Sequence, residues 1–125
     1  MTRDELTRYI FDTYSVEPDY PFPGDNTSAV FRHAGNHKWF ALVMNIPAQK
    51  LGLPSKNRID IVNMKCDSVL IGSFRGLPGL FLAYHMNKES WITAALDGSA
   101  PDETVKTLLD MSYQATLPKV RKKRN

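Results

Sequence analysis

Four residues near position 85 combine side chains that could bind nucleic acid. His85, Asn87, Lys88 and Trp91 lie within seven positions of one another. A lysine can contact a phosphate, an asparagine can hydrogen-bond a base edge, and a tryptophan can stack on an exposed base. The competing interpretation is structural: a solvated lysine, an asparagine that shapes a turn, and a tryptophan in the core of a sheet.

A second candidate for phosphate contact is the cationic end of the chain. The whole chain has 16 Lys and Arg against 13 Asp and Glu, a formal charge of +3. Removing the five terminal cations leaves 11 against 13, so residues 1–118 carry −2. Such a tail would meet phosphates in random register and with strong salt dependence. A solubilising end, or a tether to RNA or a membrane surface, explains it equally well. The five residues are Lys119, Arg121, Lys122, Lys123 and Arg124.

The sequence offers little for catalysis or metal binding. Cys66 is the only cysteine, which excludes an internal disulfide and indicates a small buried side chain. The three histidines, at 33, 37 and 85, lack the spacing of metal ligands. The glycines of 72–79 lack the Gly-Lys-Ser/Thr ending of a phosphate-binding loop. We therefore expect no enzyme activity, no metal and no cofactor.

The elements that would position these residues follow from hydrophobic periodicity and turn signals. Thr2 and Glu5 have the spacing of a capping box, and apolar residues then follow at helical spacing as far as Tyr14. Asp67 is a good N-cap for a helix over Ser68–Phe74, with Val69, Leu70 and Phe74 facing inward. A last helix begins near Pro101 and ends before Pro118. The predicted strands are Ser28–His33, Lys38–Asn45, Arg58–Met64, Leu80–His85 and Ser90–Leu96, with Ile46–Asn57 as a loop.

The resulting order, α-β-β-β-α-β-β-α, predicts an α+β fold of two layers. Strands joined by short turns favour a five-stranded antiparallel sheet with the helices packed on one face. We expect a single domain over residues 1–118, followed by the basic tail 119–125. No window is apolar enough to cross a membrane and the first residues lack a signal peptide's apolar region. These features, with the single cysteine, predict a cytoplasmic protein without a membrane partner.

Several short strings then resemble the MmcQ/YjbR family of small bacterial proteins. The most specific is His85-Met86-Asn87-Lys88-x-x-Trp91, followed by Asp110 and Ser112-Tyr113. Lys65-Cys66-Asp67 and Pro21–Asp25 are similar to other segments of that family, and Ser90 departs from its pattern, since many relatives have histidine there. The resemblance implies a "double-wing" domain with a curved antiparallel sheet. It also implies DNA binding, because family members commonly carry that label.

The leading functional hypothesis is thus a DNA-binding protein without catalytic activity. Its contact face would comprise the residues near position 85, extended by Arg32 and Lys38 on the first hairpin and by the tail. One alternative is a protein-interaction module that holds a peptide or a partner subunit on the concave side of the sheet. The other is a small-ligand pocket near Trp91, Tyr84 and Tyr113.

Overall fold

The computed structural model describes residues 1–118 and arranges them as the sequence predicts. The five tail cations from Lys119 to Arg124 lie outside the described residues. The helices are α1 (Arg3–Tyr14), α2 (Ser68–Phe74) and α3 (Asp102–Thr116), with a 3-10 turn η1 (Ala48–Leu51). The strands are β1 (Ala29–Arg32), β2 (Trp39–Pro47), β3 (Arg58–Lys65), β4 (Leu80–Leu82) and β5 (Trp91–Ala95).

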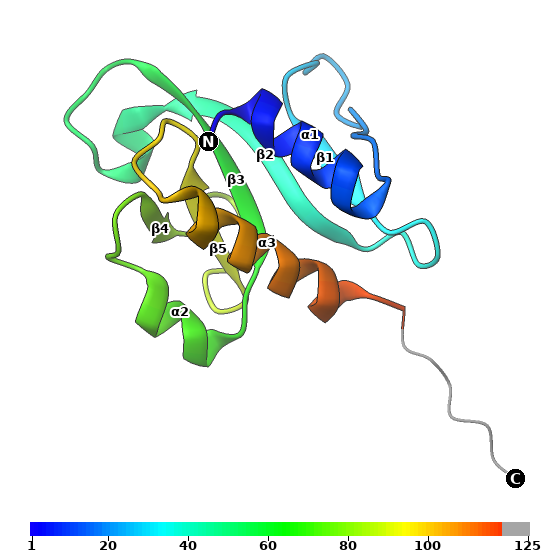
Figure 1. Cartoon of the computed structure of the whole chain (residues 1–125). Helices are drawn as coiled ribbons and strands as arrows, with labels where there is room; N and C mark the ends of the chain where they lie inside the picture. The colour runs from blue at the N-terminus through cyan, green and yellow to red at the C-terminus, as the bar shows by residue number, and fades with distance from the viewer. Residues whose placement is uncertain (119–125) are drawn as a thin grey trace, which may run out of the picture.

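The strands form one antiparallel sheet in the order β1-β2-β3-β5-β4. β1 and β4 are therefore its two edges. Helices α1 and α3 run side by side across one face of the curved sheet (Figure 1). Residues of all three helices join the same hydrophobic cluster, so the predicted α+β class with helices on one face is confirmed.

The helix ends follow the local chemistry of the sequence, with one error. The capping box of Thr2 and Glu5 is present, and the Asp67 carboxylate accepts from the Val69 N–H at 2.9 Å. The inward orientation expected for Val69 is wrong, because its side chain is 80% exposed. The buried residue of α2 is Ile71.

The strands differ from the expected limits mainly at the connection between β4 and β5. β4 ends at Leu82, and two residues later the Tyr84 N–H bonds to the Thr93 hydroxyl at 2.9 Å. His85 then takes a left-handed backbone with φ 56°, which a strand does not accommodate. At the other end of the sheet, β2 continues to Pro47, two residues beyond the expected limit.

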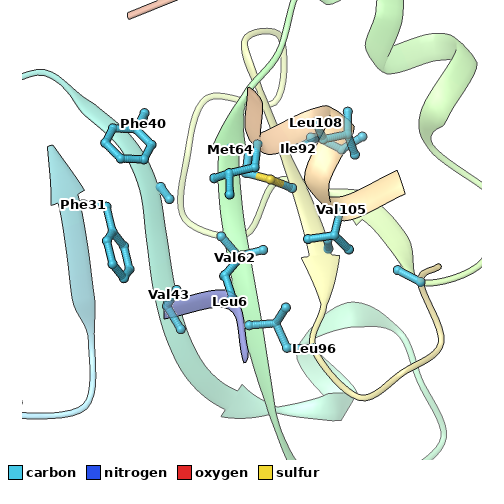
Figure 2. Packing of buried hydrophobic residues seen from close by; sticks show 14 of the residues in the cluster. Leu6, Phe31, Phe40, Val43, Val62, Met64, Ile92, Leu96, Val105 and Leu108 are labelled. Atoms are coloured by element: carbon cyan, nitrogen blue, oxygen red, sulfur yellow. The ribbon is translucent and has the colours of Figure 1, made fainter. Parts of the chain in front are cut away.

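The main core lies between the helices and the sheet (Figure 2). Alternation along β3 sends Val62 and Met64 into this core, and Ile59 and Ile61 to the opposite face. On that opposite face, Leu51, Leu53 and Tyr84 pack against a second, smaller cluster. We call this side of the sheet, which segments 48–57 and 83–90 cover, the loop face.

A buried hydroxyl joins the last helix to the sheet. Ser112 Oγ accepts from the Lys65 N–H at 2.8 Å and donates to the Phe40 carbonyl at 2.6 Å. One α3 side chain thereby contacts the backbones of both β2 and β3. Asp110, two residues earlier on the same helix, accepts from the hydroxyls of Tyr9 and Tyr14 on α1. Ser112 thus holds the helical layer to the sheet, and Asp110 holds α3 to α1 within the helical layer.

Ser112→Ala should lower the free energy of unfolding by about 1–3 kcal/mol, because it leaves a buried N–H without a partner. Urea denaturation measures the change. Ser73→Ala, at an exposed position of α2, is the matched control and should stay within about 0.5 kcal/mol of the parent. Equal effects of the two substitutions would contradict the role assigned to Ser112.

Candidate nucleic-acid interface

The residues predicted on the two hairpins lie at the same end of the sheet. Arg32 pairs with Trp39 across β1 and β2, and Lys65 pairs with Trp91 across β3 and β5. Since neighbouring strands are antiparallel, the connections 33–38 and 83–90 both leave the sheet at this end. The structure therefore brings Lys38 and Lys88 to one end of the molecule, although they are fifty residues apart in the sequence.

An irregularity between Phe31 and Arg32 decides which side chains reach the loop face. Phe31 pairs with Ala41, but Arg32 pairs with Trp39, so Phe40 has no partner in the register. A bulge of this kind shifts the alternation by one residue. Phe40 therefore joins the main core, and Arg32 and Trp39 project to the loop face. The Trp39 ring there lies edge-on against Phe22, with 6.0 Å between centroids.

Trp91 lies on the same face and carries a cation above its ring. The Lys65 Nζ atom is 5.7 Å from the centroid of the indole, within the range of a cation–π contact. Both side chains are half-buried, so Trp91 is not the core residue of the structural interpretation. Trp39 and Trp91 are separated by two strand spacings, roughly 10 Å.

Segment 83–90 is fixed to the sheet by a buried polar network. The Asn63 amide donates to the Tyr84 carbonyl at 3.0 Å and accepts from the Thr93 hydroxyl, which in turn accepts from the Tyr84 N–H. Asn63 and Thr93 are fully buried. The imidazole of His85 then stacks on the Tyr84 ring, with centroids 4.1 Å apart and planes inclined by 17°.

The two residues at the tip of this segment differ in their freedom to bind. Asn87 Oδ1 accepts from the Glu89 N–H at 2.8 Å, so this oxygen shapes the turn as the structural interpretation proposed. Lys88 is exposed. Lys88 and His85 therefore offer the polar contacts of this segment to a ligand.

Charge is unequally divided between the two faces. Helices α1 and α3 carry six carboxylates against three cations. The strand positions of the loop face carry no carboxylate. Their polar and aromatic residues are Arg32, Trp39, Asn63, Lys65, Phe81, Trp91 and Thr93. Of the loop-face cations, Arg32 is paired, since its Nε lies 2.7 Å from Asp19 Oδ2. Lys38 is exposed and makes no ion pair among residues 1–118.

Tyr113 lies on the helical side and cannot share a pocket with Trp91 and Tyr84. Its ring stacks on Tyr14 at 3.8 Å and packs against the main core. Tyr84 packs in the loop-face cluster and Trp91 points to the same side. The ligand pocket expected from these three residues is therefore not formed, because the sheet separates them.

The remaining titratable groups near α3 are held by structural contacts. His33 is buried, with Nε2 2.8 Å from Thr116 Oγ1 and 3.1 Å from the Tyr113 carbonyl. Burial lowers the pKa of His33, and the Tyr113 carbonyl partly opposes this shift. Burial raises the pKa of Tyr14, and the hydrogen bond to Asp110 adds to the effect.

Cys66 is buried, and burial raises the pKa of its thiol, with Asp67 contributing further. This environment disfavours the nucleophilic thiolate. Among residues 1–118, no group of three or more His, Cys, Asp or Glu could hold a metal ion. Over the same residues, no helix is long and apolar enough to cross a membrane.

The family model for YjbR matches residues 11–115, which include every strand and most of the helical layer. The chain belongs to the YjbR family. The Bacillus subtilis relative described as uncharacterized protein YyaQ is 34% identical over 116 residues, covering 93% of this chain and 98% of YyaQ. The predicted family resemblance is therefore confirmed.

Solved structures of similar proteins have the same fold as this YjbR-family chain. A crystal structure of a Pseudomonas syringae protein superposes with a TM-score of 0.91, at 41% identity over 94% of this chain and 100% of that one. A solution NMR structure from the same species gives 0.90 at 38% identity, with full coverage of both chains. The DUF419 domain of Deinococcus radiodurans protein DR2400 gives 0.66 at 25% identity, over 91% of this chain and 77% of that one.

Sequence reasoning missed part of this interface. Trp39 was assigned only to a strand, and its place on the loop face depends on the bulge. The sequence singles out Lys65 only as part of the Lys65-Cys66-Asp67 string, whereas its Nζ lies over Trp91. The pairing of Lys65 with Trp91 across two strands would have predicted this contact, and that pairing cannot be read from the local sequence.

Thr93→Val keeps the shape of the side chain but leaves the Tyr84 N–H and Asn63 Oδ1 without partners. We expect a loss of about 1–3 kcal/mol in stability and faster amide hydrogen exchange across 83–90. Thr107→Val, at an exposed position of α3, is the control. Unchanged exchange at Tyr84 and His85 would show that the network does not hold this segment.

His33 should make stability depend on pH. Its pKa is lowered in the folded chain, so the unfolded chain binds the proton more readily as pH falls below about 6.5. The free energy of unfolding should therefore decrease between about pH 6.5 and 5, by at most about 1.4 kcal/mol per pH unit from this residue. His33→Gln should flatten this slope, and His37→Gln, on the exposed part of the same hairpin, should not. A slope unaltered by His33→Gln would contradict the assignment.

Proposed function

We propose that this YjbR-family protein binds DNA without catalysing a reaction, through the end of the sheet where segments 33–38 and 83–90 meet. The observation that carries the proposal is the loop face itself. Its strands present two tryptophans and two basic residues and no carboxylate. A DNA phosphate chain needs positive charge along its path, and base recognition needs planar or hydrogen-bonding groups between the cations.

The cations at this end of the sheet differ in how readily they can contact phosphate. Lys38 and Lys88 are exposed, so their ammonium groups can reach a backbone that crosses the end of the sheet. Lys65 is more restricted because it lies over Trp91. Arg32 would have to exchange Asp19 for a phosphate, so we assign it a smaller contribution.

The tryptophans supply the second half of the proposed contact. Both are half-buried on the loop face, and a spacing of roughly 10 Å allows each to contact a different base. His85, stacked on Tyr84, presents a further planar group beside Lys88. The tail cations Lys119, Arg121, Lys122, Lys123 and Arg124 would add contacts to phosphate that do not depend on sequence.

Intrinsic fluorescence tests this proposal directly, because Trp39 and Trp91 are the only tryptophans in the chain. Titration of the full chain with a 20-base-pair duplex should change this fluorescence, and binding should weaken as salt rises from 50 to 200 mM. Lys38→Ala and Lys88→Ala should each reduce the slope of log affinity against log salt by about one unit.

Arg8→Ala is the matched control, since it removes one exposed cation from the helical face. It should leave the slope unchanged. Absence of duplex binding at 50 mM salt would overturn the proposal. Equal effects of Arg8→Ala and Lys88→Ala would also overturn it, because the contact would then not be specific to this end of the sheet.

A further inference from the structure

The β4 edge of the sheet has backbone groups that face away from the molecule. The Ala95 N–H bonds to the Gly79 carbonyl at 2.8 Å, which fixes the alternation along the antiparallel pair. Phe81 therefore directs its N–H and carbonyl toward β5, and Leu82 directs both groups to the free side. The Leu80 carbonyl also faces the free side, whereas the Leu80 N–H is bonded to Leu77.

The opposite edge of the sheet is partly covered. Asp19 and Val30 exchange two backbone hydrogen bonds of 2.8 Å, so the chain before β1 pairs with that edge at Val30. Among residues 1–118, β4 has no such bridge on its free side, so another strand can be added there.

Two hollows flank β4. One, of about 430 Å³, is lined by residues 75–77 and 79–82. The other, of about 470 Å³, is lined by Lys50 and Leu51 of η1 together with residues 81–85 and Lys88. Phe81 and Leu82 line both, so the hollows meet at the strand.

The hollows differ in chemistry and both lack acidic side chains. Leu77 and Leu82, which are 45% and 42% exposed, give the first an apolar wall, with Arg75 as its only charged lining residue. The second has Lys50, Lys88 and His85 around Phe81, Tyr84 and Leu51. An apolar side chain fits the first hollow, and a carboxylate fits the cations of the second.

We propose that the β4 edge binds an extended segment of a partner protein in which apolar and acidic residues alternate. The segment would add to the sheet as a sixth strand, with backbone hydrogen bonds to Leu82 and Leu80. Because successive side chains of a strand point to opposite faces, apolar residues would enter the hollow beside Leu77. The acidic residues would meet Lys50 and Lys88.

This site shares only two residues with the DNA contact. Lys88 and His85 line the second hollow and also belong to the proposed DNA interface. Leu82 and Lys50 belong only to the peptide site, and Lys38 belongs only to the DNA interface. Variants of these three residues therefore distinguish failure of one proposal from failure of the other.

The probe is a seven-residue peptide, acetyl-Thr-Val-Glu-Val-Glu-Val-Thr-amide, titrated into the ¹⁵N-labelled full chain. We expect chemical-shift changes concentrated at the amides of Leu80, Leu82 and 83–88. Hydrogen exchange of the Leu82 amide should become slower. Lys50→Glu should weaken binding about tenfold, because it reverses one charge in the second hollow. Lys56→Glu, an exposed lysine in the same loop that lines neither hollow, should change affinity less than twofold.

Modified peptides test the two parts of the proposal without altering the chain. N-methylation of alternate residues, in either register, removes the donors that would pair with β4 and should abolish the shifts at Leu82. Lysine in place of both glutamates should weaken binding at least tenfold.

Absence of shifts at millimolar peptide would overturn the proposal, as would equal binding of either modified peptide. A dimer of the free chain whose Leu82 amide is protected would also overturn it, because a second copy would then be the occupant of the edge.

Discussion

The buried amide of Asn63 is the constraint on which the loop face depends. Its side chain lies at the centre of the sheet and is fully buried, so both its donor and its acceptor need partners inside the protein. Thr93 satisfies the oxygen and the Tyr84 carbonyl accepts from the nitrogen. These hydrogen bonds hold the backbone after β4 against the sheet. His85 and Lys88 therefore lie beside the strand ends.

The residues that match the family pattern fall into two groups, one structural and one exposed. Ser112 and Asp110 are structural, since one joins α3 to two strands and the other receives two tyrosine hydroxyls from α1. Asn87 is structural as well, because its side chain forms the turn. His85, Lys88 and Trp91 remain available on the loop face. A motif that looks uniform in the sequence thus has a supporting part and an exposed part.

Local chemistry predicted most of the fold, because caps, turns and alternation act over a few residues. The capping box of α1, the Asp67 N-cap and the alternation along β3 needed no tertiary information. Val69 was misplaced because a seven-residue helix offers too few positions to fix its buried side.

The errors in the site have a different physical cause. Tyr113 and Trp91 were assigned to one pocket because sequence proximity to motif residues does not reveal which face of the sheet each occupies. The bulge beside Arg32 depends on how two strands pair, so the exchange of Trp39 and Phe40 between faces could not be predicted from either strand alone. The free edge of β4 likewise follows from the strand order. These features depend on pairing between residues far apart in the sequence. Local patterns in a single sequence contain little information about such pairing.

The unequal charge of the two faces has a consequence for how the molecule meets any polyanion. Helices α1 and α3 carry six carboxylates against three cations, whereas the loop-face strands carry Arg32 and Lys65 and no carboxylate, so the charges of these elements contribute a dipole component directed across the sheet. A negative surface exerts a torque on such a dipole and turns the helices away from it. At physiological salt this field decays over about 8 Å, so the domain is oriented only in the final approach. Net charge alone, slightly negative for residues 1–118, would instead suggest repulsion from every direction.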